Sequence, residues 1–315
     1  MIDIIIPAYN SHDTIMRTLF SICYQDISDK FNVYICNDAS DINYSKEINF
    51  FKDILNIKEI TLDKNSGPGV ARQVGIDNST SEYIVFIDSD DVFNSPYSVN
   101  ILYTSIVNNN LDVVCGAFIE EKEGERVTRL DDNVWLHGKI YRRKFLIEHN
   151  IRFNDSYCNE DNGFNQSIML REPKIAYLDN IVYCWMFNEN SITRKNNYKY
   201  RYTGLIGYVY NITSALKSAI EDNCNEELIS SLALSSITSM YYYYLEFMNE
   251  DDSIELLKNT KDLKDIYIKY PVRDLELKQE ILDSEYDFFK NEVVNIDNPN
   301  ITFLEFLDLV SEVEV

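Results

Sequence analysis

Three carboxylates lie within four positions in the segment Asp88–Asp91 (DSDD), which directly follows the apolar run Tyr83–Ile87. Carboxylates crowded at the end of a buried strand repel one another, and a nearby cation relieves that repulsion. Oxygen ligands suit Mg²⁺ and Mn²⁺, which also bind the phosphates of substrates. The alternative is a polar turn in which Asp90 or Asp91 caps a following helix. The segment therefore predicts either a divalent-metal site or a capped turn.

Two further polar segments follow apolar runs nearer the start of the chain. Asp38 comes after the run Phe31–Cys36, where its carboxylate can accept hydrogen bonds from a nucleobase or a ribose. The segment Pro7–Asn10 comes after the run Ile2–Ile6, and the ring of Tyr9 can lie over a nucleobase. Each segment also has a simpler explanation, an Asx or Ser turn for the first and a loop leading to a helix for the second.

The segment Asn65–Arg72 (NSGPGVAR) places two glycines at the predicted start of a helix. Glycines allow a backbone to approach a ligand, and a helix N-terminus attracts phosphate. Arg72 adds a guanidinium that can bind an anion. The segment has neither the G-x-x-x-x-G-K-[ST] pattern of a P-loop nor the third glycine of G-x-G-x-x-G. It therefore argues against a P-loop ATPase and against a nicotinamide-dependent dehydrogenase.

Glu160 and Asp161 open an amphipathic segment that carries Phe164, Ile168 and Leu170. Acidic residues are common in a first helical turn because they interact favourably with the helix dipole. A carboxylate at this place can also act as a general base that takes a proton from a substrate hydroxyl. Considered with the other polar segments, the pair supplies the base that a group-transfer enzyme needs.

These polar segments must be positioned by the elements between them. The first part of the chain alternates apolar strand candidates with helical apolar spacing, which predicts right-handed β-α-β units and a parallel sheet. Ligands of such sheets bind beyond the carboxyl ends of the strands, where the polar segments lie. The strand candidates are Ile2–Ile6, Phe31–Cys36, Ile57–Leu62 and Tyr83–Ile87, and the helix candidates carry Ile15, Leu19 and Ile22, then Ile48, Phe51, Ile54 and Leu55, then Val70 and Val74.

From about residue 111 onward, strands and helices no longer alternate strictly. The predicted strands are Leu111–Phe118, Arg126–Leu130, Ile175–Leu178 and Ile181–Phe187, and the predicted helices are Tyr141–Asn150 and Asp161–Arg171. This part of the chain is therefore predicted to mix strands and helices without strict alternation.

After about Tyr198 the sequence predicts almost only helix, with long segments at Leu205–Ile220 and Glu226–Met248. The run Tyr241–Tyr244 falls in the second of them. We expect this helix to be buried against the catalytic part of the chain, with the tyrosine hydroxyls hydrogen-bonded. A platform on which sugar rings stack is the alternative for the tyrosines.

The net charge is −23, because 29 basic residues stand against 52 acidic ones in 315. A field of this sign repels nucleic acids and anionic membranes. The six cysteines form no C-x-x-C pair and no zinc-site spacing with histidine, so we expect free thiols in a reducing compartment. With neither a signal peptide nor a long apolar run in the sequence, we expect a cytoplasmic protein without a transmembrane anchor.

Seven segments, taken together and in this order, resemble family 2 of the inverting glycosyltransferases with a GT-A fold. Each is a weak motif alone, but seven within about the first 195 residues make the resemblance specific. They are DIIIPAYN at Asp3–Asn10, NDAS at Asn37–Ser40, NSGPGVARQVGI at Asn65–Ile76, YIVFIDSDD at Tyr83–Asp91, HGKIYRRKFL at His137–Leu146, NEDNGF at Asn159–Phe164 and NSITR at Asn190–Arg194.

The resemblance implies a GT-A type α/β/α domain with a mainly parallel sheet at residues 1–197. The resemblance does not cover residues 198–315, where the sequence predicts a mostly α-helical region that would bind an acceptor, build a homo-oligomer or have a structural role. The implied reaction moves a hexosyl or N-acetylhexosaminyl group from a UDP-sugar to an acceptor hydroxyl, with inversion and with Mn²⁺ or Mg²⁺. The acceptor would be a glycan, a teichoic-acid-like polymer, a lipid-linked sugar or a protein, and nucleic acid is not expected.

The resemblance also implies roles for individual residues. Asp161 matches the catalytic base, with Glu160 beside it, and Asp90 and Asp91 match the metal ligands. The donor is expected to contact Pro7, Ala8, Tyr9, Asp38, Arg72, Asp88, Asp90, Ser191 and Arg194. The last two of these belong to a segment that closes over the diphosphate in the family.

Three other functions use similar residues. A nucleotide-sugar-binding protein without transferase activity would need Asp38 and Asp91 but not Asp161. A DNA-modifying sugar transferase would need a basic surface, for which only the short stretch Arg142–Lys144 is at hand. A nucleotidyltransferase would carry a glycine-rich loop where the segment Pro7–Asn10 lies.

Overall fold

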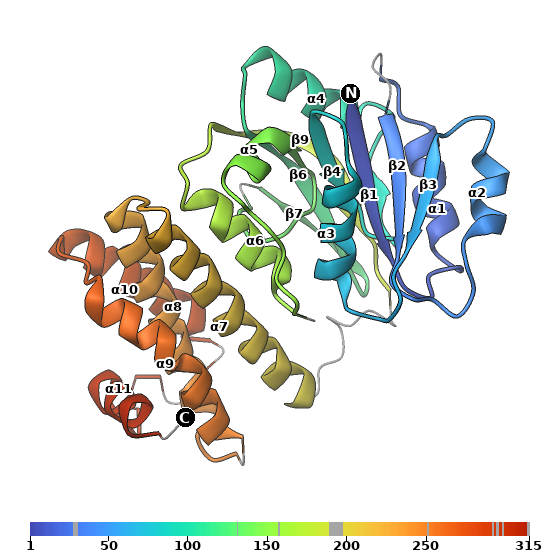
Figure 1. Cartoon of the computed structure of the whole chain (residues 1–315). Helices are drawn as coiled ribbons and strands as arrows, with labels where there is room; N and C mark the ends of the chain where they lie inside the picture. Colours follow the sequence, from blue (N-terminus) through green and yellow to red (C-terminus); the bar gives the residue numbers. More distant parts are fainter. Residues whose placement is uncertain are drawn as a thin grey trace. The chain divides into compact units, whose positions relative to one another are not determined.

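The chain divides into two compact units, Met1–Asn196 and Asn197–Val315. The computed structural model describes residues 1–27, 31–130, 132–156, 158–188, 198–250, 252–291, 293, 296–297 and 299–313. The first unit is an α/β structure built on one sheet, and the described residues of the second unit form helices and the turns between them (Figure 1).

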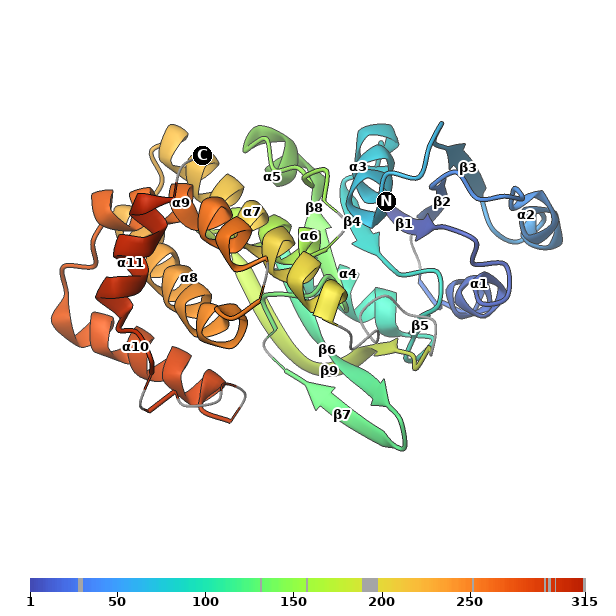
Figure 2. The same cartoon turned by 90° about the horizontal axis from the view of Figure 1, so that it is seen from below.

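The sheet of the first unit has the strand order β3-β2-β1-β4-β8-β6-β9-β5, with β7 paired to β6. Strands β1 to β4 pair in parallel, which confirms the prediction from their alternation with helices. Strand β8 is antiparallel to both of its neighbours, so the second half of the sheet is mixed. The hairpin of β6 and β7 projects from the sheet in the view from below (Figure 2).

The strands are β1 (Ile2–Ala8), β2 (Phe31–Asn37), β3 (Ile57–Thr61), β4 (Tyr83–Phe86), β5 (Val92–Phe93), β6 (Val113–Lys122), β7 (Glu125–Arg129), β8 (Lys139–Arg142) and β9 (Ile175–Trp185). The helices of the first unit are α1 (Ile15–Cys23), α2 (Ser45–Phe51), α3 (Pro68–Asn78), α4 (Ser98–Asn108), α5 (Arg143–Glu148) and α6 (Glu160–Met169). Those of the second unit are α7 (Tyr198–Glu221), α8 (Glu226–Phe247), α9 (Ser253–Lys269), α10 (Leu275–Phe289) and α11 (Phe303–Glu312).

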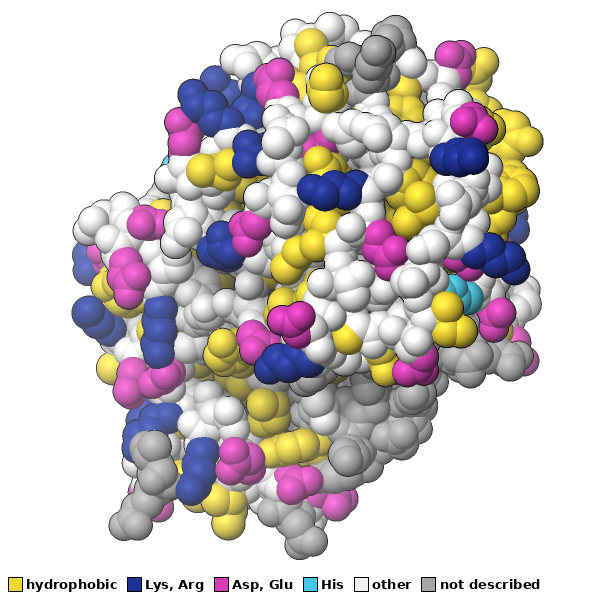
Figure 3. Space-filling model, turned by 45° about the vertical axis from the view of Figure 1, so that its right-hand side comes forward, with side chains coloured by type: hydrophobic (Ala, Val, Ile, Leu, Met, Phe, Trp, Pro, Cys, Tyr) yellow, Lys and Arg dark blue, Asp and Glu magenta, His cyan; other side chains and the backbone are white. Residues whose placement is uncertain are grey.

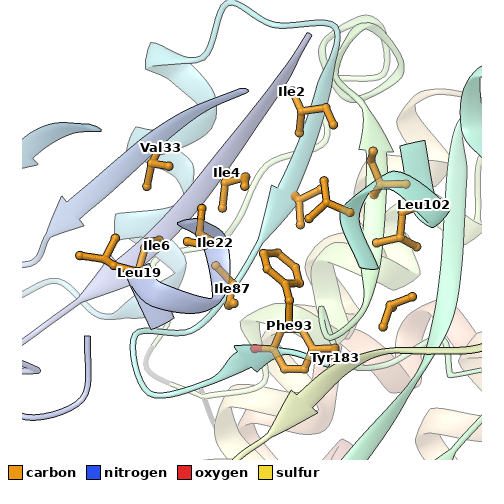
Figure 4. Close-up of a cluster of buried hydrophobic side chains, with 14 of the residues drawn as sticks. Ile2, Ile4, Ile6, Leu19, Ile22, Val33, Ile87, Phe93, Leu102 and Tyr183 are labelled. Carbon is orange, nitrogen blue, oxygen red and sulfur yellow. The ribbon is translucent and has the colours of Figure 1, made fainter. Parts of the chain in front are cut away.

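Strand β1 is buried on both faces because helices cover both sides of the sheet. Ile2, Ile4 and Ile6 point into one hydrophobic core, which they share with residues of α1 and α4 (Figure 4). Ile5 points into the other core, formed with residues of α3, α5 and α6. The alternation of side chains along a strand therefore distributes one apolar run between two layers.

Helix α3 packs very closely on the sheet at Gly75. A Cβ atom added there would lie 2.4 Å from Ile5 Cγ2 and 3.0 Å from Cys36 Sγ. Only glycine leaves room for this approach. The position of α3 on the sheet also positions the segment Asn65–Arg72, which leads into the helix and contains its first residues.

Asp3 is a buried carboxylate near the start of β1 that holds the turn between α3 and β4. It accepts hydrogen bonds from Ser79 Oγ at 2.5 Å, from Ser81 Oγ at 2.7 Å and from the backbone N–H groups of Thr80 and Ser81 at 2.9 Å. Burial acts to raise the pKa of Asp3, but these bonds bring it below its ordinary value. Strand β4, which leads into the acidic segment, is thereby tied to β1.

Three predicted elements differ from the structure. Residues 141 and 142, predicted as helix, belong to β8, because this short strand pairs with β4 on one side and β6 on the other. Residues 175–185 form one strand rather than two, and its pairing with β6 shifts register around Gly116 and Ala117. Helix α2 ends at Phe51, before Ile54 and Leu55.

The run Tyr241–Tyr244 lies on α8 and packs inside the second unit. Tyr241 donates a hydrogen bond to the backbone carbonyl of Ile301 at 2.9 Å, and its ring lies 5.7 Å from Phe306. Tyr242 and Tyr243 pack against Phe289 of α10, at ring-centroid distances of 5.3 and 4.8 Å. These partners belong to the helical unit itself. Because Tyr241 and Tyr244 are only 7% and 6% exposed, their rings are not a sugar-stacking platform.

Three features of the structure relate to composition: the state of the cysteines, the hydrophobicity of the helices and the distribution of charged side chains. All six cysteines are free. None of the helices in the described ranges has the length and hydrophobicity required to cross a membrane. On the face shown in Figure 3, Lys and Arg side chains are interspersed with Asp and Glu and form no continuous basic surface.

Candidate functional site

The acidic segment Asp88–Asp91 lies beyond the carboxyl end of β4, as predicted. No helix follows it directly, because Val92 and Phe93 form β5 and helix α4 begins at Ser98. The interpretation of Asp90 or Asp91 as a helix cap is therefore wrong. Helix α1 holds the turn instead: Arg17 donates a hydrogen bond to the carbonyl of Asp90, and Thr18 Oγ1 donates one to the carbonyl of Asp91 at 2.8 Å.

Asp91 is fully buried and lies at the centre of the site. Its Oδ2 accepts a hydrogen bond from the Tyr183 hydroxyl at 2.6 Å, and its Oδ1 accepts one from the N–H of Met186 at 2.8 Å. Asp90 points elsewhere, and its Oδ2 accepts a hydrogen bond from Asn188 Nδ2 at 2.7 Å. Strand β9 and the residues that follow it thus hold both carboxylates.

His137 completes a cluster with Asp88 and Asp91. Its Nε2 lies 3.7 Å from Asp88 Oδ2 and 3.9 Å from Asp91 Oδ2. One ligand atom from each of the three residues lies within 4.8 Å of the others, so the three can hold a metal ion together. His137 Nδ1 is buried and has no hydrogen-bond partner among the described residues, and the ring packs 4.8 Å from that of Tyr183. Two carboxylates and an imidazole suit Mn²⁺, and the carboxylates suit Mg²⁺.

The ionisation of the acidic residues reflects this crowding. Burial and then the charges of Asp88 and Asp90 raise the pKa of Asp91 well above its ordinary value. Burial also raises the pKa of Asp90. For Asp88, burial acts in the same direction, but the charge of Arg72, the neighbouring His137 and the hydrogen bond from Arg72 bring its pKa well below the usual range. A cation at the cluster would favour the charged form of Asp91.

His137 was not among the site residues predicted from the sequence. The chain has three histidines, and this one begins the segment His137–Leu146 quoted for the resemblance. It approaches Asp88 and Asp91 only because β8 pairs beside β4, and that pairing was not predicted.

Arg72 links the acidic segment to the start of α6. The guanidinium donates one hydrogen bond to Asp88 Oδ1 and another to Glu160 Oε1, both at 2.7 Å. The side chains of Arg72 and Glu160 are only 7% and 8% exposed. Gly69 permits this arrangement, since a Cβ atom there would lie 2.9 Å from Glu160 Cγ. The structure therefore places Arg72 and Glu160, predicted as separate site residues, in one buried ion pair.

Asp161 differs from Glu160 although the two are neighbours. It remains partly exposed, and its Oδ1 accepts a hydrogen bond from the N–H of Asn162 at 2.8 Å. Burial and then the charge of Glu160 raise the pKa of Asp161 to about 7. A carboxylate with a pKa near neutrality can accept and release a proton at physiological pH.

The other predicted donor contacts lie at the ends of β1 and β2. Pro7 and Ala8 are buried in β1, and Tyr9 follows with 51% of its surface exposed. Asp38 accepts hydrogen bonds from the N–H groups of Ser66 and Gly67, both at 2.8 Å. Its carboxylate thus holds the glycine-rich segment. Ser191 and Arg194 lie outside the described residues.

The sequence and fold also match known proteins. Residues 3–159 match the family described as "Glycosyl transferase family 2". The chain is 31% identical over 238 residues to the minor teichoic acid biosynthesis protein GgaA of Bacillus subtilis, covering 67% of this chain and 53% of that protein. It is 27% identical over 197 residues to the poly(ribitol-phosphate) beta-N-acetylglucosaminyltransferase TarS of Staphylococcus aureus, covering 57% of this chain and 34% of TarS.

The solved structures agree with the sequence comparison. The crystal structure of S. aureus TarS 1–349 in complex with UDP-GlcNAc superposes with a TM-score of 0.70 at 17% identity, covering 91% of this chain and 92% of that one. The fold of the chain is thus that of TarS 1–349, a GT-A sheet with a helical C-terminal region. The chain spans about half of GgaA and about a third of full-length TarS.

Proposed function

Because residues 3–159 belong to glycosyl transferase family 2, we propose that the chain transfers a sugar from a UDP-sugar to an acceptor hydroxyl with inversion and with a divalent metal. The observation that carries this proposal is a chain of ion pairs. Arg72 joins Asp88 of the metal-binding cluster (Asp88, Asp91 and His137) to Glu160, which is next to the partly exposed Asp161. A site for a diphosphate and a base for a hydroxyl are what the reaction needs.

The identity of the sugar and the acceptor belongs to the same proposal. The structure of TarS 1–349 contains UDP-GlcNAc, and TarS is named as a poly(ribitol-phosphate) beta-N-acetylglucosaminyltransferase. We extend this to a hexose or N-acetylhexosamine as the transferred sugar and to a cell-surface polymer rich in hydroxyl groups as the acceptor. An α-linked UDP-sugar and a β-linked product correspond to inversion.

Asp161 would act as the base. As the bond from the sugar carbon to the diphosphate oxygen breaks, the acceptor oxygen forms its bond on the opposite face of the ring, and Asp161 takes the hydroxyl proton. The sugar carbon becomes oxocarbenium-like in this displacement, as in glycoside hydrolysis. Glu160 is not free for this role because its carboxylate is paired with Arg72. A single base, Asp161, is sufficient for a single displacement.

A divalent cation would be held by Asp91 together with Asp88 and His137, with Asp90 adjacent. Each carboxylate oxygen of Asp91 keeps a lone pair beside the hydrogen bond it accepts. The cation would neutralise negative charge that develops on the leaving diphosphate. Arg72 would keep Asp88 ionised and oriented for this purpose.

Removal of the metal is expected to weaken UDP binding at least about tenfold. Mutation of a residue that only supports a metal ligand already lowers metal affinity or activity by about 10- to 100-fold. Calorimetric titration of UDP with Mn²⁺ and then with EDTA measures the difference. Asp91→Asn and His137→Gln should resemble the EDTA sample, whereas Asp53→Asn, an exposed acid on the same unit, should behave as wild type. Equal UDP affinity in EDTA and Mn²⁺ would remove the metal from the proposal.

The reaction rate is expected to depend on pH through Asp161. The charged form is the base, so kcat/KM should rise with pH and level off above the pKa of about 7. The contribution of Asp161 to the free energy of unfolding should change with pH in the opposite direction. Because its pKa is raised in the folded state, this contribution stabilises the fold at low pH and is lost as pH rises through about 7. Rate profiles and thermal unfolding of wild type and Asp161→Asn test both trends. A pH-independent kcat/KM between pH 5 and 8 would argue against Asp161 as base.

A further inference from the structure

The two tryptophans of the chain lie against each other at the edge of the candidate site. Trp135 and Trp185 are the only ones among 315 residues. Their ring centroids are 5.2 Å apart, with 47° between the planes. Both contact His137, at ring distances of 6.0 Å for Trp135 and 4.9 Å for Trp185. The pair therefore borders the residue that joins Asp88 and Asp91 in the cluster.

The backbone next to each tryptophan is fixed to the site. Met186, directly after Trp185, donates its N–H to Asp91 Oδ1 at 2.8 Å. On the other side, Asn165 Nδ2 donates hydrogen bonds to the carbonyls of Val134 at 2.8 Å and Trp135 at 3.1 Å. Asn165 follows Asp161 by four residues on α6, so the two lie on the same face of the helix. Trp135 is thus connected to the base side of the site and Trp185 to the metal side.

The two tryptophans are more exposed than the core residues that they pack against. Phe118 and Tyr183, which also pack on His137, are each 1% exposed. Trp135 and Trp185 remain partly exposed. Both also pack against the core that includes Phe118 and Tyr183, so they reach from that core to the surface beside the carboxylates. Partly exposed aromatic residues beside a polar cluster are a feature of binding sites. Aromatic rings with a polar rim are typical of sites for small ligands, and a sugar ring has an apolar C–H face that fits them.

We propose that Trp135 and Trp185 form a stacking site for a sugar ring beside the metal-binding cluster. This inference rests on the proposed function, because that function brings a sugar to this place. The ring can belong to the donor or to the acceptor, and the chemistry of recognition is the same. The tryptophans would orient the sugar between the metal side and Asp161 and would contribute nothing to the binding of UDP itself.

Tryptophan fluorescence, excited selectively beyond the absorption of tyrosine, tests the proposal directly, because all tryptophan emission of the chain comes from this pair. The probes are UDP, UDP-GlcNAc, UDP-glucose and, with UDP present, the methyl β-glycoside of N-acetylglucosamine, each with Mn²⁺. We expect a change in emission with a sugar-bearing probe that UDP alone does not produce. A change with a UDP-sugar assigns the ring to the donor, and a change only with the glycoside assigns it to the acceptor.

Affinities of variants provide the second readout. Trp135→Leu and Trp185→Leu should each weaken binding of the responding sugar probe about three- to tenfold, with UDP and Mn²⁺ affinity unchanged. Trp135→Phe and Trp185→Phe should retain most of it. Tyr24→Leu, which changes an aromatic residue that directly follows α1 and is 70% exposed, is the matched control and should have no effect.

The failure of this inference is distinguishable from the failure of the proposed function. If calorimetry shows that UDP-GlcNAc or UDP-glucose binds while emission and the Leu variants behave as with UDP alone, the tryptophan pair is structural and the inference is wrong. If no nucleotide binds with any metal, the proposed function itself is wrong and the inference falls with it.

Discussion

Replacement of Asp161 by Asn is expected to lower kcat about 10³-fold, within the range that a positioned general base contributes. Asn has the shape of Asp but cannot take the proton of the acceptor hydroxyl. The carboxylate is partly exposed, and burial and Glu160 raise its pKa to about 7, which suits proton transfer near neutral pH. Because Asp161 does not contact the metal-binding cluster in this account, the UDP affinity should stay within about twofold of wild type. Initial rates and calorimetry measure the two quantities.

The neighbouring acid provides the control. Glu160→Gln keeps a side chain of the same shape beside Arg72, and Glu160 is not available as a base because it is paired with Arg72 at 2.7 Å. Its kcat should therefore fall much less than that of Asp161→Asn. The reverse order, with Glu160→Gln nearly inactive and Asp161→Asn nearly normal, would move the role of base to Glu160.

Replacement of Arg72 by Met is expected to lower the free energy of unfolding by about 3–5 kcal/mol, the cost of leaving a buried carboxylate unpaired. Arg72 and Glu160 are 7% and 8% exposed, and Arg72 also holds Asp88. Met fills a similar volume, so the loss comes from charge rather than from a cavity. Thermal and urea unfolding measure the change. UDP affinity should fall as well, since Asp88 loses the partner that orients it.

An exposed ion pair of the same type is the matched control. Arg152 bonds both oxygens of Asp77 at 3.1 and 2.8 Å, but the two side chains are 51% and 45% exposed. Arg152→Met should therefore cost no more than about 1 kcal/mol. The double variant Arg72→Met with Glu160→Leu should recover part of the stability, because it removes the buried charge together with its partner. Equal losses for Arg72→Met and Arg152→Met would contradict the role of burial.

The first half of the fold follows from local patterns. Runs such as Ile2–Ile6 and Tyr83–Ile87 are buried on both faces, so their apolar character alone identifies parallel strands. The polar residues that follow such runs, Asp38 and Asp88 among them, can therefore be placed at one edge of the sheet from the sequence alone. These features could be predicted because each depends on a few neighbouring residues.

The second half depends on contacts between distant residues. Strand β8 has four residues and leads directly into α5, so its apolar residues read as part of the helix. Its pairing with β4 brings His137 to Asp88, about fifty positions earlier in the chain. The partners of Arg72 lie 16 and 88 positions away. Sequence spacing identifies such residues as candidates, but only the fold shows which of them meet.

The most direct test of the account is release of UDP from a panel of UDP-sugars with Mn²⁺ or Mg²⁺, first without acceptor and then with poly(ribitol phosphate), alongside Asp161→Asn. We expect slow, EDTA-sensitive release from one UDP-sugar, a faster rate once a suitable acceptor is present, and a large loss of rate in the variant. Absence of both UDP binding and UDP release with every metal would contradict the account and leave Asp88, Asp91 and Arg72 with a structural role only.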